Sequence, residues 1–250
     1  MLHSKMKGFV QVIRKAKTPK QVVMFPFGGG SGYSYMELIN EIPRDTEIII
    51  INPPGHLLNG GKPLESIEEM VYFYSKELRP LLKRGTLFFG HSIGGIAAYE
   101  ICRGLEKEFD IKKMIISSVN PPHRTMEDVD LHSDMDTGQL IQKCTVLGGM
   151  PEIFKEAPEL LDGFIQGLRA DLKALEKYSH RNRIKTEKIK TGASILYSDG
   201  DYIVNPEKLK EWELYLDCSE YIKFSGDHFY LFETSNRKAV GRIITKYVNM

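Results

Sequence analysis

The chain has 250 residues, 42% of them hydrophobic, which is enough apolar material for the core of one large domain. Lysine and arginine number 34 against 33 aspartates and glutamates, and this net charge of +1 gives no sign of nucleic-acid or polyanion binding. The three cysteines fit no zinc pattern or disulfide framework, and no stretch is suited to a membrane span or a secretory signal, so we expect a soluble, reduced, cytoplasmic protein.

Six short apolar runs predict strands that are buried on both faces of a sheet. They are residues 21–25, 47–51, 86–90, 114–118, 194–197 and 221–224. Amphipathic stretches separate them; one begins after Ser66, which forms a capping-box pattern with Glu69, and another ends the chain. Strands alternating with helices predict an α/β fold with a mostly parallel, doubly wound central sheet flanked by helices.

One long interval, between residues 120 and 190, contains no predicted strand. Its helical pieces are "TGQLIQKCTVLGG", which Asp136 or Thr137 could cap, and "APELLDGFIQGLRADLKALEKY". Two interpretations stand: ordinary crossover helices, or a helical lid at about residues 123–180 inserted in a single domain of residues 1–250. The basic stretch 177–190 that follows is a solvated connector or a docking patch for an acidic partner.

The segment "FFGHSIGG" contains a G-x-S-x-G pattern centred on Ser92. An apolar run precedes it and a helical pattern follows it, which is the context of a tight strand-to-helix turn. Such a turn strains the central residue and requires small neighbours, here Gly90 and Gly94, and it exposes the hydroxyl beside a helix N-terminus. Ser92 is therefore a candidate nucleophile; the alternative is a turn in which Ser92 only caps the helix.

A serine hydroxyl needs a base at neutral pH, and the base needs an orienting carboxylate. In the order nucleophile, acid, base, only His180 and His228 lie late enough in the chain and beyond the helical insert. His228 follows the last predicted strand, at the carboxyl edge of the sheet, whereas His180 lies in the basic connector. We therefore predict His228 as the base.

The acid is predicted from the segment "SDGDYIV", which follows the strand at 194–197. Asp199 and Asp201 would both lie at the carboxyl edge, but Asp199 precedes a glycine and can form the turn itself. Asp227 adjoins the histidine too directly, and Asp217 ends a helical stretch. Asp201 is the predicted orienting acid, with Asp199 as the alternative.

The loop "FPFGGGSGYSY", residues 25–35, is the candidate for an oxyanion hole. Such a site takes one backbone N–H from the residue after the nucleophile, Ile93, and one from an early loop, here Phe27 or Gly28. The loop lacks the patterns of a phosphate-binding or dinucleotide-binding loop. The alternative is a flexible glycine turn without a function.

Taken together, these motifs resemble those of the type II thioesterases, the stand-alone enzymes of nonribosomal peptide and polyketide assembly lines, which belong to the α/β-hydrolase superfamily. The resemblance extends from about residue 21 to 232, through "FPFGGGS", "INPPGH", "FFGHSIGG", "LGGMP", "LRADLKALEKY", "SDGDYIV" and "FSGDHFYLF". It implies a cofactor-independent serine thioesterase with Ser92 as nucleophile, Asp201 as acid and His228 as base. It also implies a lid that admits a phosphopantetheine arm, and acyl or peptidyl carrier domains as partners; we expect a monomer.

The chain departs from the family pattern at three positions: His56 replaces an arginine, Tyr202 a proline and Asp227 a frequent glycine. None of these changes removes a member of the predicted triad. Two other functions remain open: a carboxylesterase or acyltransferase that uses the same triad, and a scaffold that binds acyl chains or carriers without turnover.

Overall fold

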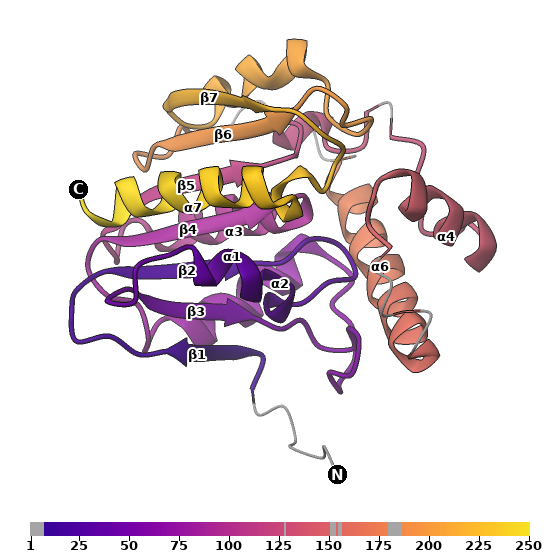
Figure 1. Ribbon diagram of the computed structural model, residues 1–250, viewed down its shortest axis with the longest axis horizontal. Helices are drawn as coiled ribbons and strands as arrows, with labels where there is room; N and C mark the ends of the chain where they lie inside the picture. Colours follow the sequence, from indigo (N-terminus) through magenta and orange to yellow (C-terminus); the bar gives the residue numbers. More distant parts are fainter. Residues whose placement is uncertain (1–7, 128, 151–153, 155–156, 180–186) are drawn as a thin grey trace.

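The computed structural model describes residues 8–127, 129–150, 154, 157–179 and 187–250, and a twisted sheet lies at its centre (Figure 1). In these ranges seven strands are arranged in the order β1-β3-β2-β4-β5-β6-β7. The strands are β1 (Val10–Arg14), β2 (Gln21–Phe25), β3 (Glu47–Ile51), β4 (Thr86–His91), β5 (Ile111–Ser117), β6 (Ala193–Ser198) and β7 (Cys218–Phe224). β1 pairs antiparallel with β3 and every other pair is parallel, which confirms the predicted sheet.

The six predicted strands are all present, but β1 was not predicted. All five of its residues are only half-buried, and the polar Gln11 and Arg14 interrupt any continuous apolar run. Because β1 lies at the edge of the sheet and pairs only with β3, it lacks the two-sided burial that marks the central strands.

Helices cover both faces of the sheet, as Figure 1 shows. One face carries α2 (Ile67–Leu78) and α3 (Ile93–Leu105), and the other carries α1 (Met36–Asn40) and α7 (Thr234–Val248). Successive side chains of a central strand enter opposite cores: Val23 packs with α2 and α3, whereas Val22 packs with α1 and α7. Four short 3-10 helices complete this part of the fold: η1 (Gly32–Tyr35), η2 (Pro122–Arg124), η3 (Pro206–Leu214) and η4 (Tyr230–Phe232).

The N-terminus of α2 differs in one detail from the predicted capping box. The Ser66 side chain accepts a hydrogen bond from the Glu69 N–H, as expected. The Glu69 carboxylate, however, accepts from the N–H of Glu65, one residue before the predicted donor. The Ser66 half of the predicted box is therefore formed, whereas the Glu69 half falls on the residue before the N-cap.

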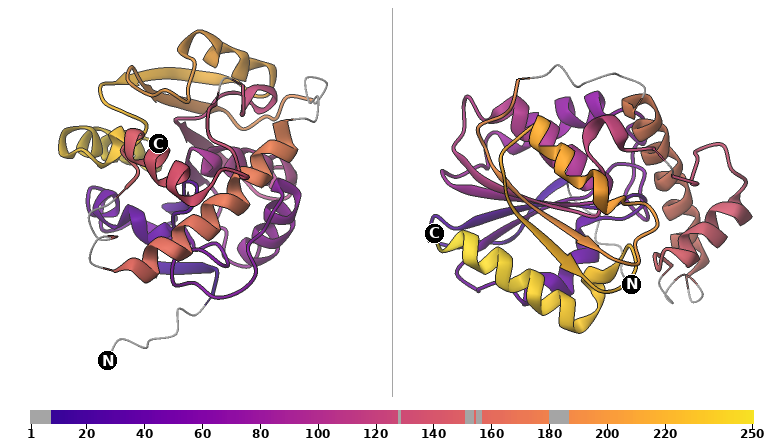
Figure 2. Two further views of the ribbon diagram at one scale, coloured as in Figure 1. Left: turned by 90° about the vertical axis from the view of Figure 1, so that its right-hand side faces the viewer. Right: turned by 90° about the horizontal axis from the view of Figure 1, so that it is seen from above.

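Among the described residues between β5 and β6, two α-helices are present: α4 (Thr137–Val146) and α6 (Pro158–Ser179). Asp136 caps α4 in a complete capping box with Gln139, and Gly148 and Gly149 close its end by bonding back to Thr145 and Cys144. Both helices lie beyond the carboxyl ends of the parallel strands (Figures 1 and 2). They enclose a third apolar core against that edge. Residues 180–186, with His180 and the centre of the basic stretch, lie outside the described residues.

Candidate active site

Ser92 lies at the turn between β4 and α3 and has a strained backbone, with φ of 56° and ψ of −131°. A positive φ at a non-glycine residue costs about 1–3 kcal/mol, which the surrounding packing must offset. A β-carbon at Gly90 would overlap the Gly94 carbonyl, and one at Gly94 would overlap the Phe25 carbonyl. Ser92 occupies the N-cap position of α3, but its side chain makes no capping hydrogen bond. Its hydroxyl therefore does not serve as a helix cap.

The acid and histidine loops bring Asp201 and His228 together. Asp201 follows β6, His228 follows β7, and the Gly200 N–H donates to the Gly226 carbonyl at 3.0 Å, which ties the two loops to each other. His228 Nδ1 lies 2.8 Å from Asp201 Oδ2, and Asp201 Oδ1 accepts from the Ile203 N–H at 2.9 Å. The side chains of this pair are 2% and 0% exposed, so water does not compete for the bond.

The charges around His228 assign its tautomer. Burial raises the pKa of the Asp201 carboxyl, but the nearby His228 and the hydrogen bonds it accepts outweigh burial and leave that pKa below its usual value. Because an ionised carboxylate only accepts, His228 Nδ1 carries the proton and Nε2 of the neutral ring is the atom that can accept another. His91, whose ring centroid is 5.0 Å from that of His228, has a pKa well below its usual value, chiefly through burial. It therefore adds no second charge.

The other candidate carboxylates lie elsewhere. Asp199 pairs with Lys223 at 3.3 Å on the surface, and Asp217 pairs with Lys188 at 3.4 Å. Asp227 Oδ1 accepts a hydrogen bond from the N–H of Phe229 at 2.8 Å. Of the four aspartates that the sequence singled out, only Asp201 contacts His228 through a hydrogen bond.

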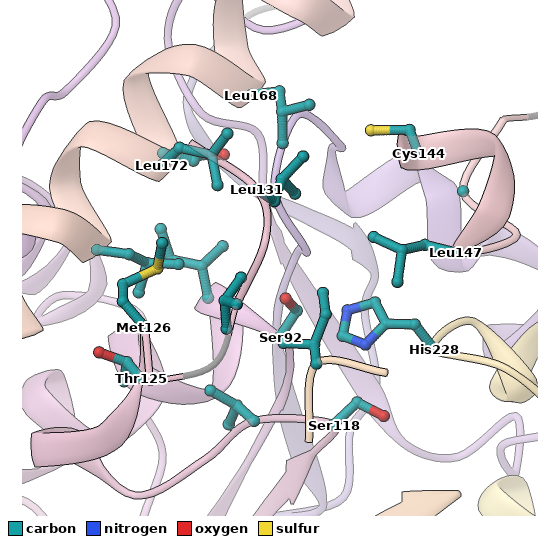
Figure 3. A pocket seen from close by; sticks show the side chains of 18 of the residues that line it. Ser92, Ser118, Thr125, Met126, Leu131, Cys144, Leu147, Leu168, Leu172 and His228 are labelled. Atoms are coloured by element: carbon teal, nitrogen blue, oxygen red, sulfur yellow. The ribbon is translucent and has the colours of Figure 1, made fainter. Parts of the chain in front are cut away.

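Ser92 and His228 line one pocket between the sheet edge and the inserted helices (Figure 3). The non-atom space within it is about 670 Å³, a volume that includes space open to solvent. The inserted segment lines most of the remaining wall with apolar side chains: Val129, Leu131, Cys144, Leu147, Phe164, Leu168, Leu172 and Leu175. A reacting group at Ser92 would thus have an apolar chamber beside it.

The two predicted sources of oxyanion donors adjoin this pocket. Gly28 and Ile93 both line it, and the ring of Phe27 packs edge-on against Phe229 at 4.9 Å between centroids. Because Gly94 has no side chain, the start of α3 approaches the backbone of Phe25 and the loop that follows. The N-terminus of α3 also carries a partial positive charge toward this point.

A family model for the thioesterase domain matches residues 20–247, which is most of the chain. The chain belongs to the thioesterase family. The predicted resemblance and the α/β-hydrolase fold are thereby confirmed, and the protein is an enzyme of the thioesterase class.

Two curated relatives and two solved structures illustrate the similarity. The gramicidin S biosynthesis protein GrsT of Aneurinibacillus migulanus is 25% identical over 91% of this chain and 89% of that protein. Thioesterase PikA5 of Streptomyces venezuelae is 28% identical over 84% of this chain and 75% of that protein. The type II thioesterase BorB of the borrelidin cluster superposes with a TM-score of 0.85, at 25% identity over 96% and 97% of the two chains. The type II thioesterase YbtT of the yersiniabactin pathway superposes with a TM-score of 0.82, at 26% sequence identity over 97% of this chain and 98% of that chain.

The thioesterase also contains a buried pair that the sequence did not predict, His56 with Asp171. His56 Nε2 lies 2.9 Å from Asp171 Oδ2, and the two side chains are 1% and 5% exposed. One signal was present: Asp171 falls on the apolar face of α6, three residues after Leu168 and four before Leu175. A charge at such a position is buried and needs a partner, but the partner is 115 residues away in the sequence.

Within the described ranges of the thioesterase, no three histidine, cysteine, aspartate or glutamate side chains gather closely enough to hold a metal ion. Nor does any described helix have the length and apolar character needed to cross a membrane. The expectation that catalysis needs no cofactor stays a prediction.

Proposed function

We propose that this thioesterase hydrolyses acyl, aminoacyl or peptidyl thioesters carried by the phosphopantetheine arm of carrier domains, with Ser92, Asp201 and His228 as its catalytic triad. The observation that carries the proposal is the buried hydrogen bond between His228 and Asp201 on the wall of the pocket that Ser92 also lines. The relatives support the substrate class, because YbtT is described as belonging to a nonribosomal peptide and polyketide pathway.

In the proposed acylation, His228 Nε2 takes the proton of the Ser92 hydroxyl while its oxygen attacks the thioester carbonyl. The tetrahedral oxyanion accepts hydrogen bonds from the Ile93 N–H and from that of Phe27 or Gly28. The C–S bond then breaks, the carrier thiol leaves with the proton, and Ser92 holds the acyl group as an ester.

In the proposed deacylation, water attacks the Ser92 ester while His228 again removes a proton. The acid product leaves, and the proton returns from His228 to the serine oxygen. Asp201 keeps the ring in the required tautomer and stabilises the imidazolium that forms in each half-reaction. A thiolate is a good leaving group, so its protonation contributes less than protonation of an amine would.

We further propose that the segment at about residues 123–180, with α4 and α6, is a lid on a single α/β-hydrolase domain of residues 1–250. Its apolar lining suits an acyl chain, and its position beyond the strand ends is where α/β folds bind ligands. The partners we propose are acyl or peptidyl carrier domains, and we expect the enzyme to act as a cytoplasmic monomer.

The proposal is tested with a panel of short and long acyl groups on a holo carrier protein. Wild-type protein should release the free acid, and Ser92→Ala should lose the activity. Thr125→Val is the matched control, because it removes a different hydroxyl from the same pocket and should stay within a few-fold of wild type. Full activity of Ser92→Ala would contradict the mechanism.

The same assay separates the remaining functions. Faster turnover of the matched oxygen ester than of the acyl-pantetheine thioester would indicate a carboxylesterase, and transfer to an added acceptor would indicate an acyltransferase. A protein that binds the carrier without hydrolysing its thioester, and that a serine-directed phosphonate does not label at Ser92, would be a scaffold.

A further inference from the structure

One buried carboxylate oxygen joins helix α6 to the loop of residues 25–35, which is called the oxyanion loop below because it holds the proposed oxyanion donors. Asp171 Oδ2 accepts a hydrogen bond from the Gly29 N–H at 2.9 Å and is also 2.9 Å from His56 Nε2. Gly29 directly follows Gly28, one of the two candidate donors from that loop. The position of the inserted helix is therefore coupled to the backbone that would hold the oxyanion.

The surroundings of His56 define its protonation state. Its Nε2 faces the Asp171 carboxylate, and its Nδ1 lies 3.0 Å from the Pro54 carbonyl oxygen. Both partners can only accept hydrogen bonds, so both ring nitrogens must donate, and the form that fits is the imidazolium. Burial, the largest single influence, lowers the pKa of His56, but the Asp171 charge and the two hydrogen bonds outweigh it and leave that pKa above 6.5.

Close packing makes this junction rigid. A β-carbon at Gly167 would overlap the His56 ring, and one at Gly163 would overlap the Leu57 carbonyl. These two glycines are four residues apart, and Asp171 follows four residues later, so all three lie on the same face of α6. Interiors packed this tightly transmit displacements, so a shift of Asp171 would move the Gly29 backbone as well.

We propose that His56 and Asp171 are positioning residues for thioester hydrolysis: as a charged pair they hold the Gly28–Gly29 backbone so that the Gly28 N–H faces the developing oxyanion. The proposal rests on the function proposed above. The pair acts only through the backbone of the loop and does not exchange protons with substrate. Activity should therefore depend on two histidines in opposite ways, with His228 required neutral and His56 required protonated.

This dependence predicts that kcat falls on the alkaline side of its pH profile. Activity decreases as the pH rises through the raised pKa of His56 and that ring loses its proton. The titratable groups that act on the pair are its own members and Tyr74 of α2, whose phenol faces Asp171. Burial, reinforced by the Asp171 charge, keeps the pKa of Tyr74 well above its usual value, so Tyr74 stays neutral through this range.

The test measures kcat and KM of the full-length enzyme against pH for wild type, His56→Gln, Asp171→Asn and Asp171→Ala. Complete loss of one oxyanion donor costs about 10²–10³ in kcat, so a misplaced donor in His56→Gln should cost about ten- to a hundredfold. KM should change less than about threefold, and the alkaline fall should disappear. Asp171→Asn keeps an acceptor for Gly29 without the charge, and should retain more activity than Asp171→Ala.

Lys173→Met is the matched control. Lys173 lies on the same helix and pairs with Glu65 at 2.7 Å, but that pair is exposed and does not touch the loop. Its kcat and pH profile should match wild type. A folded His56→Gln enzyme with wild-type kcat and an unchanged alkaline limb would overturn the proposal, as would an increase in KM alone.

Two further readouts keep the outcomes distinct. Ser92→Ala is assayed alongside: its full activity would refute the proposed function, whereas inactive Ser92→Ala with a wild-type His56→Gln profile would refute only this inference. If His56→Gln does not fold, nitrogen-15 NMR of the wild-type histidines decides. Protons on both His56 nitrogens above pH 6.5 support the pair, and a neutral ring there contradicts it.

Discussion

The thioesterase contains two buried histidine–carboxylate pairs that differ in what the second ring nitrogen meets. His228 uses Nδ1 to contact Asp201 at 2.8 Å, and its ring lines the pocket, so Nε2 can take a proton from a reacting group. His56 uses Nε2 to contact Asp171 at 2.9 Å, while the Pro54 carbonyl occupies its Nδ1. We therefore propose that the same two residue types form a proton-exchanging pair in one place and a fixed ion pair in the other.

The largest predicted effect is the difference in kcat between a variant that lacks His228 and a variant that lacks His56. His228→Ala deletes the base, and by analogy with other serine hydrolases kcat should fall by about 10⁴–10⁶-fold. The decrease for His56→Gln should be at least a hundred times smaller, because that ring touches no reacting atom. Single-turnover assays on an acyl carrier measure both. Similar losses in the two variants would erase the distinction between the pairs.

The second prediction compares two aspartates of one loop. Asp201→Asn presents the wrong tautomer to Ser92, and kcat should fall by about 10⁴-fold. Asp199→Asn removes only a surface pairing with Lys223 and should change kcat less than about twofold. Steady-state rates of the two variants under identical conditions check this. If Asp199→Asn were the inactive variant, the assignment of the acid would be wrong.

The third prediction concerns stability and pH at the His56–Asp171 pair. Breaking a buried pair by removing one partner costs about 3–5 kcal/mol. Because the pKa of His56 is raised on folding, its contribution is complete below about pH 6.5 and is lost as the pH rises through the raised value. The free energy of unfolding of wild type should therefore exceed that of His56→Gln most at low pH.

Urea unfolding of both proteins between pH 5.5 and 9 measures this difference. It should narrow steadily toward the alkaline end of the range. A difference that grows with pH would show that His56 is neutral in the folded protein, and the fixed-ion-pair interpretation would then fail.

The fourth prediction, with the smallest expected effect, tests the contact between the Ser92 turn and the loop of residues 25–35. A methyl group at Gly94 would overlap the Phe25 carbonyl, so Gly94→Ala should destabilise the protein by about 1–3 kcal/mol and lower kcat. Gly104→Ala is the control in the same helix, since its β-carbon would meet no atom within 4 Å. It should be neutral or stabilise by up to about 1 kcal/mol. Equal melting temperatures for the two variants would contradict the packing argument.

Local patterns were sufficient to predict the central strands and the strained turn at Ser92. The catalytic roles assigned to Ser92, Asp201 and His228 stay predictions. The local patterns work because each depends on a few neighbouring residues: a continuous apolar run, or small residues around a turn. Edge strand β1 was not predicted, because a strand that pairs on one side only has no such apolar run. The contacts of Asp171 with His56 and Gly29 were not predicted, because they join residues 115 and 142 positions apart in the sequence. A pattern of neighbouring residues cannot indicate such a contact.

The most direct test of the central claim is to find where the acyl group goes. Wild-type thioesterase is mixed with an acyl-pantetheine thioester, quenched within one turnover, digested and mapped by mass spectrometry. The account predicts one acyl group on the peptide that contains Ser92, and none on that peptide in Ser92→Ala. Turnover without acylated Ser92, or acyl transfer to another pocket residue such as Cys144 in its place, would contradict it.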